Sequence, residues 1–195
     1  MSYLKNIKWE IVALTMPRVK RNCPKCGNDA SFKNSQKFRV NANKNKLDVW
    51  LIYQCEKCKS TWNMAIYERV SCIDIDSTQY ELFLNNDLEL AKEYGFDIAI
   101  HNKNKVKLEF ENVEYEIIGE DINILQSDFN KKNKIVVDIR CKYSLGLRVD
   151  KVLSKKLGVS RGKVKKLYEN SIICEASQKD LLKEKINDKI RIYIG

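Results

Sequence analysis

Four of the seven cysteines form two pairs of identical spacing, Cys23 with Cys26 and Cys55 with Cys58. Two intervening residues let a tight turn aim both sulfur atoms of a pair at one point, and two such turns supply the four thiolates of a tetrahedral Zn²⁺ site. Gly27, directly after the first pair, can adopt the positive φ that such a turn requires. Because protein thiolates would fill all four positions, we expect a structural zinc ion with no open coordination position.

A redox-active Cys-x-x-Cys motif is one alternative, and two unrelated pairs of free cysteines are another. A redox motif needs a single pair at the start of a helix, and neither pair here precedes a helical pattern. The remaining cysteines, Cys72, Cys141 and Cys174, stand alone in apolar stretches. We expect each to be a small buried side chain, with a regulatory thiol as the alternative.

The sequence offers little that could perform acid–base or nucleophilic catalysis. His101 is the only histidine, and it lies in a segment rich in Lys and Asn, where we expect a solvated loop. The middle of the chain has carboxylates, but it lacks a glycine-rich phosphate loop and a paired nucleophile and base. We therefore expect a binding protein that is not an enzyme.

The formal net charge of +10 is unevenly distributed along the 195 residues. Residues 1–66 carry +9, residues 67–146 carry −6 and residues 147–195 carry +7. Two basic ends around an acidic middle favour a polyanionic partner, most simply nucleic acid. The alternative is that the Lys-rich surfaces only keep the protein in solution.

The sequence shows no membrane-spanning or targeting pattern. Its apolar runs are far shorter than the roughly 20 residues of a membrane helix, and its first residues lack the apolar core of a signal peptide. We therefore expect a cytoplasmic protein with reduced thiols, in which paired cysteines are metal ligands rather than disulfides.

The elements around the cysteine pairs follow from apolar alternation. Two strands are predicted between the pairs, Gln36 to Asn41 and Leu47 to Tyr53, with a hairpin tip over residues 43–46. Large apolar groups on both faces of the second strand suggest that both faces are covered. Cations interleave with aromatic rings in this segment: Lys33, Lys37, Arg39, Lys44, Lys46, Lys57 and Lys59 with Phe32, Phe38, Trp50, Tyr53 and Trp62. Such a surface can bind single-stranded nucleic acid. The alternative is that the aromatic rings form the core of the segment and the lysines only face water.

The pattern of the acidic middle segment predicts a small α+β region. Apolar spacing predicts one helix over residues 80–94, which Gly95 would end. Clean alternation then predicts a hairpin of residues 106–110 and 113–117, and residues 134–140 form a further strand.

The basic C-terminal segment predicts two helices followed by two strands. Val149, Val152, Leu153 and Leu157 line one helix face, and Gly158 ends that helix. Ser160 is a good N-cap for a second helix with Val164 and Leu167 inside. Residues 172–174 and 190–194 then read as strands.

This order, with Leu147-Arg148-Val149-Asp150-Lys151-Val152-Leu153, Val159-Ser160-Arg161 and Asn187-Asp188-Lys189-Ile190, resembles the RNA-binding domain of the ribosomal protein S-four type. The resemblance implies that a basic helix pair meets the RNA backbone, with Arg148, Lys151, Ser160, Arg161, Lys165 and Lys166 at or near the contact surface. The glycine usual after the second helix is replaced by Asn170-Ser171, where asparagine tolerates the left-handed conformation.

The whole chain is also similar to an uncharacterised bacterial family known as a domain of unknown function. The residues that carry this similarity are 37–43, 47–53 and Thr61-Trp62-Asn63. Similarity to this family does not indicate an activity.

Together these observations predict an α+β protein with three segments: a zinc ribbon at 1–70, an acidic α+β region at 71–143 and an S-four-type domain at 144–195. The predicted function is non-enzymatic RNA binding, on ribosomal or structured RNA, with structural Zn²⁺. We expect the protein neither to associate with a membrane nor to bind a small-molecule substrate. A DNA-binding or protein-interaction adaptor that uses the ribbon is an alternative, and an RNA-modifying enzyme is another.

Overall fold

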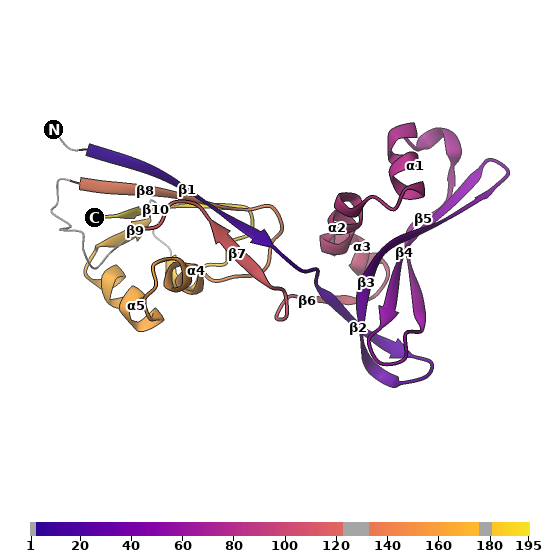
Figure 1. Ribbon diagram of the computed structural model, residues 1–195, viewed down its shortest axis with the longest axis horizontal. Helices are drawn as coiled ribbons and strands as arrows, with labels where there is room; N and C mark the ends of the chain where they lie inside the picture. The colour runs from indigo at the N-terminus through magenta and orange to yellow at the C-terminus, as the bar shows by residue number, and fades with distance from the viewer. Residues whose placement is uncertain (1–2, 123–132, 176–180) are drawn as a thin grey trace. The chain divides into compact units, whose positions relative to one another are not determined.

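The computed structural model describes residues 3–122, 133–175 and 181–195, which form an α+β protein with two five-stranded sheets (Figure 1). Contacts divide the chain into two compact units. The terminal unit combines Met1–Leu14 with Tyr115–Gly195, and the ribbon unit comprises Thr15–Glu114. The expected segments were three consecutive ones at 1–70, 71–143 and 144–195, whereas here the first strand pairs with two strands that follow the ribbon unit in the sequence.

The described residues of the terminal unit form one sheet and two main helices. Its strands are β1 (Tyr3–Ala13), β7 (Tyr115–Ile118), β8 (Asn133–Cys141), β9 (Ile173–Glu175) and β10 (Lys189–Ile194), in the order β7-β1-β8-β10-β9. Helices α4 (Val149–Lys156) and α5 (Arg161–Glu169) connect β8 to β9, and a short 3-10 turn spans Leu181–Lys183. Strands β1 and β8 run parallel, whereas the other neighbours are antiparallel.

Strand β1 belongs to this sheet because its apolar residues alternate. Ile7, Trp9 and Ile11 are all buried, and Ile7 pairs with the equally buried Val137 of β8. The indole Nε1 of Trp9 donates a hydrogen bond to the Glu120 carbonyl at 2.8 Å. The large ring is therefore buried without an unsatisfied polar group.

The ribbon unit has a second sheet, in the order β5-β4-β3-β2-β6. Its strands are β2 (Arg18–Cys23), β3 (Gly27–Asn43), β4 (Lys46–Cys55), β5 (Thr61–Ser71) and β6 (Lys107–Glu109). A 3-10 turn at Cys72–Asp74 leads to helices α1 (Ser77–Leu84), α2 (Leu88–Phe96) and α3 (Ile98–Lys103). The hairpin predicted between the cysteine pairs is confirmed, and its first strand is longer than expected.

The helices of the ribbon unit cover one face of its sheet (Figure 1). Leu51 and Tyr53 of β4 point toward this covered face and are fully buried, and the rings of Phe38 and Phe83 meet there with centroids 5.0 Å apart. The residues that alternate with them on β4 are only half-buried. Only one face of this strand is therefore fully covered, in contrast to the expectation.

The single helix expected over residues 80–94 is two helices, α1 and α2, so that prediction is wrong. Asn86 adopts a positive φ of 54°, which a continuous helix cannot contain. Asp87 then caps α2, because its side chain accepts a hydrogen bond from the Leu90 amide at 2.8 Å. Gly95 lies inside α2 rather than ending it, and a Cβ there would lie 2.8 Å from Asn34 Nδ2. The glycine allows close packing against β3.

The hairpin expected from residues 106–110 and 113–117 is also wrong. Strand β6 pairs with β2 in the ribbon unit, and β7 pairs with β1 in the terminal unit. The two alternating stretches each find a partner far away in the sequence. The residues between them carry the chain from one unit to the other.

The C-terminal elements follow the predicted order. Helices α4 and α5, the predicted strand over residues 134–140 and both final strands are present. Gly158 adopts φ of 64° after α4, and the Ser160 hydroxyl accepts a hydrogen bond from the Lys163 amide at 3.2 Å. After α5 it is Ser171, not Asn170, that takes the left-handed conformation. Among the described residues, no helix is long and apolar enough to cross a membrane.

Candidate metal centre and basic surfaces

The four cysteines of the two Cys-x-x-Cys pairs meet in the ribbon unit, with their sulfur atoms all within 4.8 Å of one another. Cys23 Sγ lies 3.4 Å from Cys58 Sγ, and Cys26 Sγ lies 3.9 Å from Cys55 Sγ. Four sulfur atoms bound tetrahedrally at about 2.3 Å from one ion would be about 3.8 Å apart. The donor set therefore fits a single tetrahedral metal ion.

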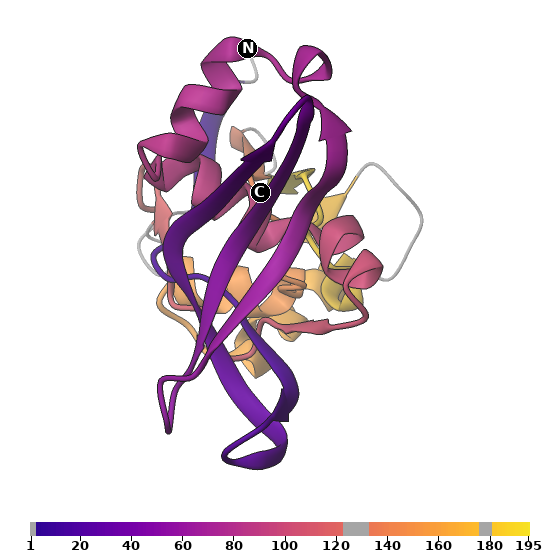
Figure 2. The same cartoon turned by 90° about the vertical axis from the view of Figure 1, so that its right-hand side faces the viewer.

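Two strand-connecting loops bring these cysteines together. Cys23 ends β2 and Gly27 begins β3 with a positive φ of 85°, while Cys55 ends β4. Because β3 is antiparallel to both β2 and β4, the two loops lie at the same end of the sheet (Figure 2). The Cys55 amide donates to the Ser60 carbonyl at 2.9 Å, which closes the second loop.

Hydrogen bonds within the cluster shift the pKa values of two of the thiols in opposite directions. Ser60, whose hydroxyl oxygen lies 3.1 Å from Cys58 Sγ, lowers the pKa of the Cys58 thiol to about 6. The neighbouring sulfur of Cys58 raises the pKa of Cys26 to about 12, and burial adds to this shift. Metal binding to thiols releases their protons, so a bound ion would replace this shared-proton arrangement.

One cationic side chain packs beside the cluster. The Arg21 guanidinium carbon lies 4.1 Å from the Trp62 ring centroid and 5.8 Å from that of Phe32. Burial lowers the pKa of Arg21, and the charge of Cys23 opposes this effect. A four-thiolate metal site carries excess negative charge, which the guanidinium would offset. Sequence reasoning missed Arg21, although its place two residues before Cys23 puts it on the same face of β2.

The aromatic residues around the ribbon mostly form its core. Phe32, Phe38 and Tyr53 are buried. For these three residues the alternative prediction, that the aromatic rings form the core, is confirmed. Trp62 lies beneath Arg21 on the same inner face. Trp50 is half-buried and pairs in register with Arg39, on the face of the sheet opposite to Tyr53.

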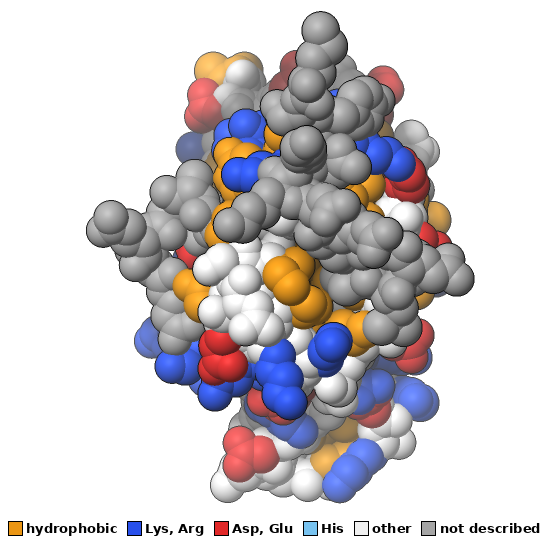
Figure 3. All heavy atoms as spheres, turned by 90° about the vertical axis from the view of Figure 1, so that its left-hand side faces the viewer, with side chains coloured by type: hydrophobic (Ala, Val, Ile, Leu, Met, Phe, Trp, Pro, Cys, Tyr) orange, Lys and Arg blue, Asp and Glu red, His pale blue; other side chains and the backbone are white. Residues whose placement is uncertain are grey.

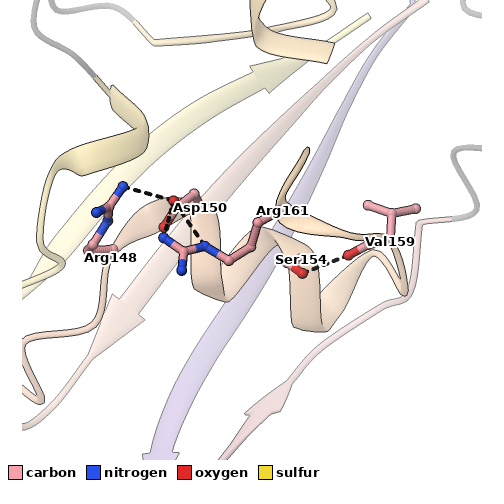
Figure 4. Close-up of polar contacts among 5 residues, drawn as sticks. All are labelled: Arg148, Asp150, Ser154, Val159 and Arg161. Atoms are coloured by element: carbon pink, nitrogen blue, oxygen red, sulfur yellow. Dashed lines mark hydrogen bonds and ion pairs between the residues drawn. The ribbon is translucent and has the colours of Figure 1, made fainter. Parts of the chain in front are cut away.

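In the terminal unit, two of the predicted RNA-contacting residues meet at a buried carboxylate (Figure 4). Asp150 Oδ2 accepts hydrogen bonds from Arg148 Nη2 at 2.9 Å and from Arg161 Nη2 at 2.6 Å. The Asp150 side chain is 9% exposed, against 40% for Arg148 and 53% for Arg161. The contact between Asp150 and Arg161 therefore joins the start of α4 to the start of α5.

Asp150 is a residue that sequence reasoning did not assign to the site. The available signal was the Arg-x-Asp spacing at the start of α4, which places a carboxylate beside one guanidinium. The turn between the helices is fixed by a second contact, in which the Ser154 hydroxyl donates to the Val159 carbonyl at 2.6 Å (Figure 4).

The other predicted RNA-contacting residues lie on the surface of the helix pair. Ser160 is exposed, but its hydroxyl is used as the N-cap of α5. Lys151, Lys165 and Lys166 are exposed, and Lys165 lies 3.6 Å from the Glu169 carboxylate. Helix α5 lies on the left-hand side of Figure 1, which Figure 3 turns toward the viewer, and Lys and Arg side chains gather in the lower part of that view.

His101 is buried, so the prediction of a solvated loop residue is wrong. It lies in α3, where its Nε2 is 2.9 Å from the Tyr53 hydroxyl and its Nδ1 is 2.7 Å from the Asp97 carbonyl. A neutral imidazole satisfies both contacts, because Nδ1 donates to the carbonyl and Nε2 accepts from the hydroxyl. Burial lowers the pKa of His101 and raises that of Tyr53. The pair belongs to the core of the ribbon unit.

The isolated cysteines differ from one another. Cys141 is buried as predicted, and its thiol donates to the Tyr143 carbonyl at 2.7 Å. Cys72 and Cys174 are exposed, so the prediction of burial is wrong for them. Cys72 begins a 3-10 turn and Cys174 lies on the short strand β9, so neither is enclosed on both sides.

Comparison with known proteins gives a family without an assigned activity. No curated protein and no solved structure matches the chain. One family model matches residues 40–179, a range that includes the second cysteine pair and the helix pair and leaves out Cys23 and Cys26. The chain therefore belongs to the family described as Protein of unknown function (DUF1062).

Proposed function

We propose that this protein binds RNA through the exposed surface of helices α4 and α5, as a binding protein that is not an enzyme. The observation that carries this proposal is the charge of the helix pair. Residues 148–169 contain eight basic and two acidic residues, and one of the two acids, Asp150, is buried between two arginines. The surface that remains is strongly cationic, which is what an RNA phosphate backbone requires.

The lysines of this surface are available to a ligand. Lys151, Lys163 and Lys166 are exposed, and no carboxylate of the described residues lies at ion-pair distance from them. Lys156 differs, because it is 9% exposed and lies 2.5 Å from Asp121. We assign phosphate contacts to the exposed lysines. We assign Arg148 and Arg161 a second role, which is to hold Asp150 between them so that Arg161 fixes α5 to α4, while each arginine side chain remains partly exposed.

The sequence resemblance to the S-four type supports the same proposal. The resemblance implies RNA binding by a basic helix pair, and it covers the segment in which the charge is concentrated. The order of α4, α5, β9 and β10 is the order that the resemblance leads us to expect. We take ribosomal or otherwise structured RNA as the partner class, because a rigid helix pair recognises backbone geometry more readily than an unstructured strand.

We further propose that the four-cysteine site holds Zn²⁺. Thiolate ligands in tetrahedral geometry select zinc over the hard cations Mg²⁺ and Ca²⁺. Cys23 and Cys55 are buried within the core of the ribbon unit. The ion would therefore stabilise this unit, and with four protein ligands it would leave no position for a substrate.

A pair of charge reversals on α5 tests the RNA-binding surface. In the full chain, Lys165→Glu with Lys166→Glu should weaken binding of a structured RNA at least about tenfold, because two phosphate contacts become repulsive. The matched control is Lys103→Glu with Lys105→Glu in the ribbon unit, which changes the net charge equally and should alter binding less than about threefold. Arg161 is unsuitable for reversal, because that change would remove a partner of Asp150.

Equal losses for both double variants would contradict the proposal, since they would show that only net charge matters. Unchanged binding by the α5 variant would also contradict it. Recovery of double-stranded DNA as the tighter ligand, or of protein partners alone, would favour the adaptor function instead.

A further inference from the structure

The sheet of the ribbon unit has a face that no helix of that unit covers. All residues of this unit, 15–114, are described, and its three helices lie on the side of Phe38 and Tyr53 (Figure 1). Figure 2 turns the opposite face toward the viewer, and no helix crosses in front of its strands. We call this the open face.

The register of β3 and β4 shows which side chains share the open face. Lys37 pairs with Ile52, and Arg39 pairs with Trp50. Both partners alternate along β4 with the buried Leu51 and Tyr53, so they point to the opposite side. Lys33 pairs with Gln54 in the same way. Three cationic residues of one strand therefore stand beside an aromatic and an aliphatic residue of the next.

These cations are not neutralised by the protein. Lys33, Lys37 and Arg39 are exposed, and no carboxylate of the described residues lies at ion-pair distance from any of them. Asp48 is the acidic residue of β4 on this face, and its Oδ1 accepts a hydrogen bond from the Arg69 amide at 2.8 Å. Charge complementarity therefore favours a polyanion on this face.

Trp50 gives the open face a stacking surface. The Arg39 guanidinium carbon lies 5.8 Å from the Trp50 ring centroid, within the range of a cation–π contact. The indole is half-buried, so part of it faces solvent. In contrast, Phe32, Phe38 and Tyr53 are buried and offer no such surface. An indole flanked by cations is the arrangement on which bases of a single strand stack while their phosphates pair with lysines.

We propose that the open face binds single-stranded nucleic acid, with a base on Trp50 and phosphates along Lys33, Lys37 and Arg39. Stacking requires an unpaired base, because the bases of a duplex already stack on one another. This site lies in the other unit from helices α4 and α5, so it goes beyond the proposed structured-RNA surface and can fail independently of it. Stacking and phosphate contacts do not read the 2′-hydroxyl, so RNA and DNA single strands are both expected to bind.

Titration of the full chain with fluorescent oligouridine and oligothymidine of roughly 12 nucleotides tests this site. Trp50→Ala should weaken binding of both by about fivefold or more, whereas Trp50→Phe keeps a stacking ring and should remain within about threefold of the wild type. Lys33→Glu with Lys37→Glu should lose at least about tenfold. Lys103→Glu with Lys105→Glu, on α3 and just beyond it, is the control of equal charge and should change little.

A duplex of the same length separates this site from general electrostatic attraction, since Trp50→Ala should leave duplex binding unchanged. Thermal unfolding of each variant checks that the ribbon unit remains folded. Unchanged oligomer affinity in Trp50→Ala and in the Lys33/Lys37 variant, or equal losses in the Lys103/Lys105 control, would overturn the proposal. The α5 variant should bind oligouridine normally; if it alone loses this binding, the single strand binds the helix pair and the open face is not the site.

Discussion

Two buried polar groups determine the local chemistry at the scale of single residues, Asp150 in the terminal unit and His101 in the ribbon unit. The sequence gives no sign of burial for either residue: Asp150 lies in a basic helical segment, and His101 lies in a segment rich in Lys and Asn. Burial gives both a structural role, because a buried charge or ring nitrogen must find partners. Neither role depends on bound RNA, so both can be tested by stability measurements alone.

Replacement of Asp150 by Asn should destabilise the protein by about 1–3 kcal/mol, because Arg148 and Arg161 would lose their common anionic partner. The half-exposed arginines keep the effect below that of a fully buried ion pair. Urea unfolding followed by circular dichroism measures the change. The control is Glu169→Gln, which removes an exposed ion pair and should alter the free energy of unfolding by less than about 0.5 kcal/mol. Equal effects of the two substitutions would contradict the structural role of Asp150.

The buried His101 should make the stability of the ribbon unit depend on pH. Burial lowers its pKa in the folded state, so the unfolded chain takes up a proton at higher pH than the folded chain does. The favourable contribution is complete above the unfolded pKa of about 6.5, and it is lost as the pH falls through that value toward the folded pKa. Urea unfolding at a series of pH values should show this decline in the wild type.

The non-titrating variant His101→Gln supplies the comparison. It should unfold more easily at neutral pH, and the free energy of unfolding should fall less steeply between about pH 7 and pH 5 than in the wild type. An unchanged slope in this variant would show that other groups cause the pH dependence.

At the scale of elements, the four-cysteine cluster identifies the part of the chain that a bound ion would stabilise. The cysteines come from the ends of β2 and β4 and from the loops that follow them. Two of the four sulfurs extend the hydrophobic core of the ribbon unit. The described residues of the terminal unit contribute no ligand to the cluster, so we expect its sheet and helices to fold without the metal.

Removal of zinc by a chelator should therefore loosen the ribbon unit and spare the terminal unit. Hydrogen exchange of the full chain should show lost protection at β2, β3 and β4 and retained protection at β8 and α4. Cys26→Ser with Cys58→Ser should give the same pattern without a chelator, whereas Cys72→Ser, outside the cluster, should not. Elemental analysis should find one zinc per chain. Uniform loss across both units, or no loss in either, would contradict this account.

Elements with a local signal could be predicted from sequence, and elements without one could not. The apolar faces of α4 and α5, the cap at Ser160 and the alternation along β4 each lie within a few residues, and the structure confirms these elements. The cluster of four cysteines could also be predicted, because two cysteines separated by two residues fit a tight turn that directs both sulfur atoms to one point. The break between α1 and α2 was missed because it depends on a left-handed residue, Asn86, in an otherwise helical pattern.

Strand pairings between residues far apart in the sequence leave no local pattern and could not be predicted. Strand β1 has the alternation of Ile7, Trp9 and Ile11, but nothing near it reveals that its partner is β8. The two strands mistaken for a hairpin likewise pair with β2 and β1. Alternation in two neighbouring stretches shows that each is a strand, but it does not show that the two strands pair with each other.

At the scale of the whole molecule, positive charge is not confined to one of the two units. The cationic helix pair belongs to the terminal unit and the open face to the ribbon unit, while the acidic middle of the sequence spans both units. Positive charge is thus present on two surfaces, and each proposal uses one of them.

Binding of structured RNA by the full chain should depend steeply on salt. Lysine and arginine contacts to phosphates release counterions, so the affinity should fall at least about tenfold between roughly 50 mM and 200 mM salt. The slope of log affinity against log salt should become shallower by about two in Lys165→Glu with Lys166→Glu. A binding constant that barely changes over this range would show that phosphate contacts are not the source of affinity.

The most direct test of RNA binding by the helix pair is ultraviolet crosslinking of the full chain to RNA in cells, followed by sequencing of the RNA and mass spectrometry of the crosslinked peptides. We predict that structured RNA is recovered and that crosslinked peptides include residues 148–169. Crosslinks confined to other parts of the chain, or no RNA above a sample that was not irradiated, would contradict the account.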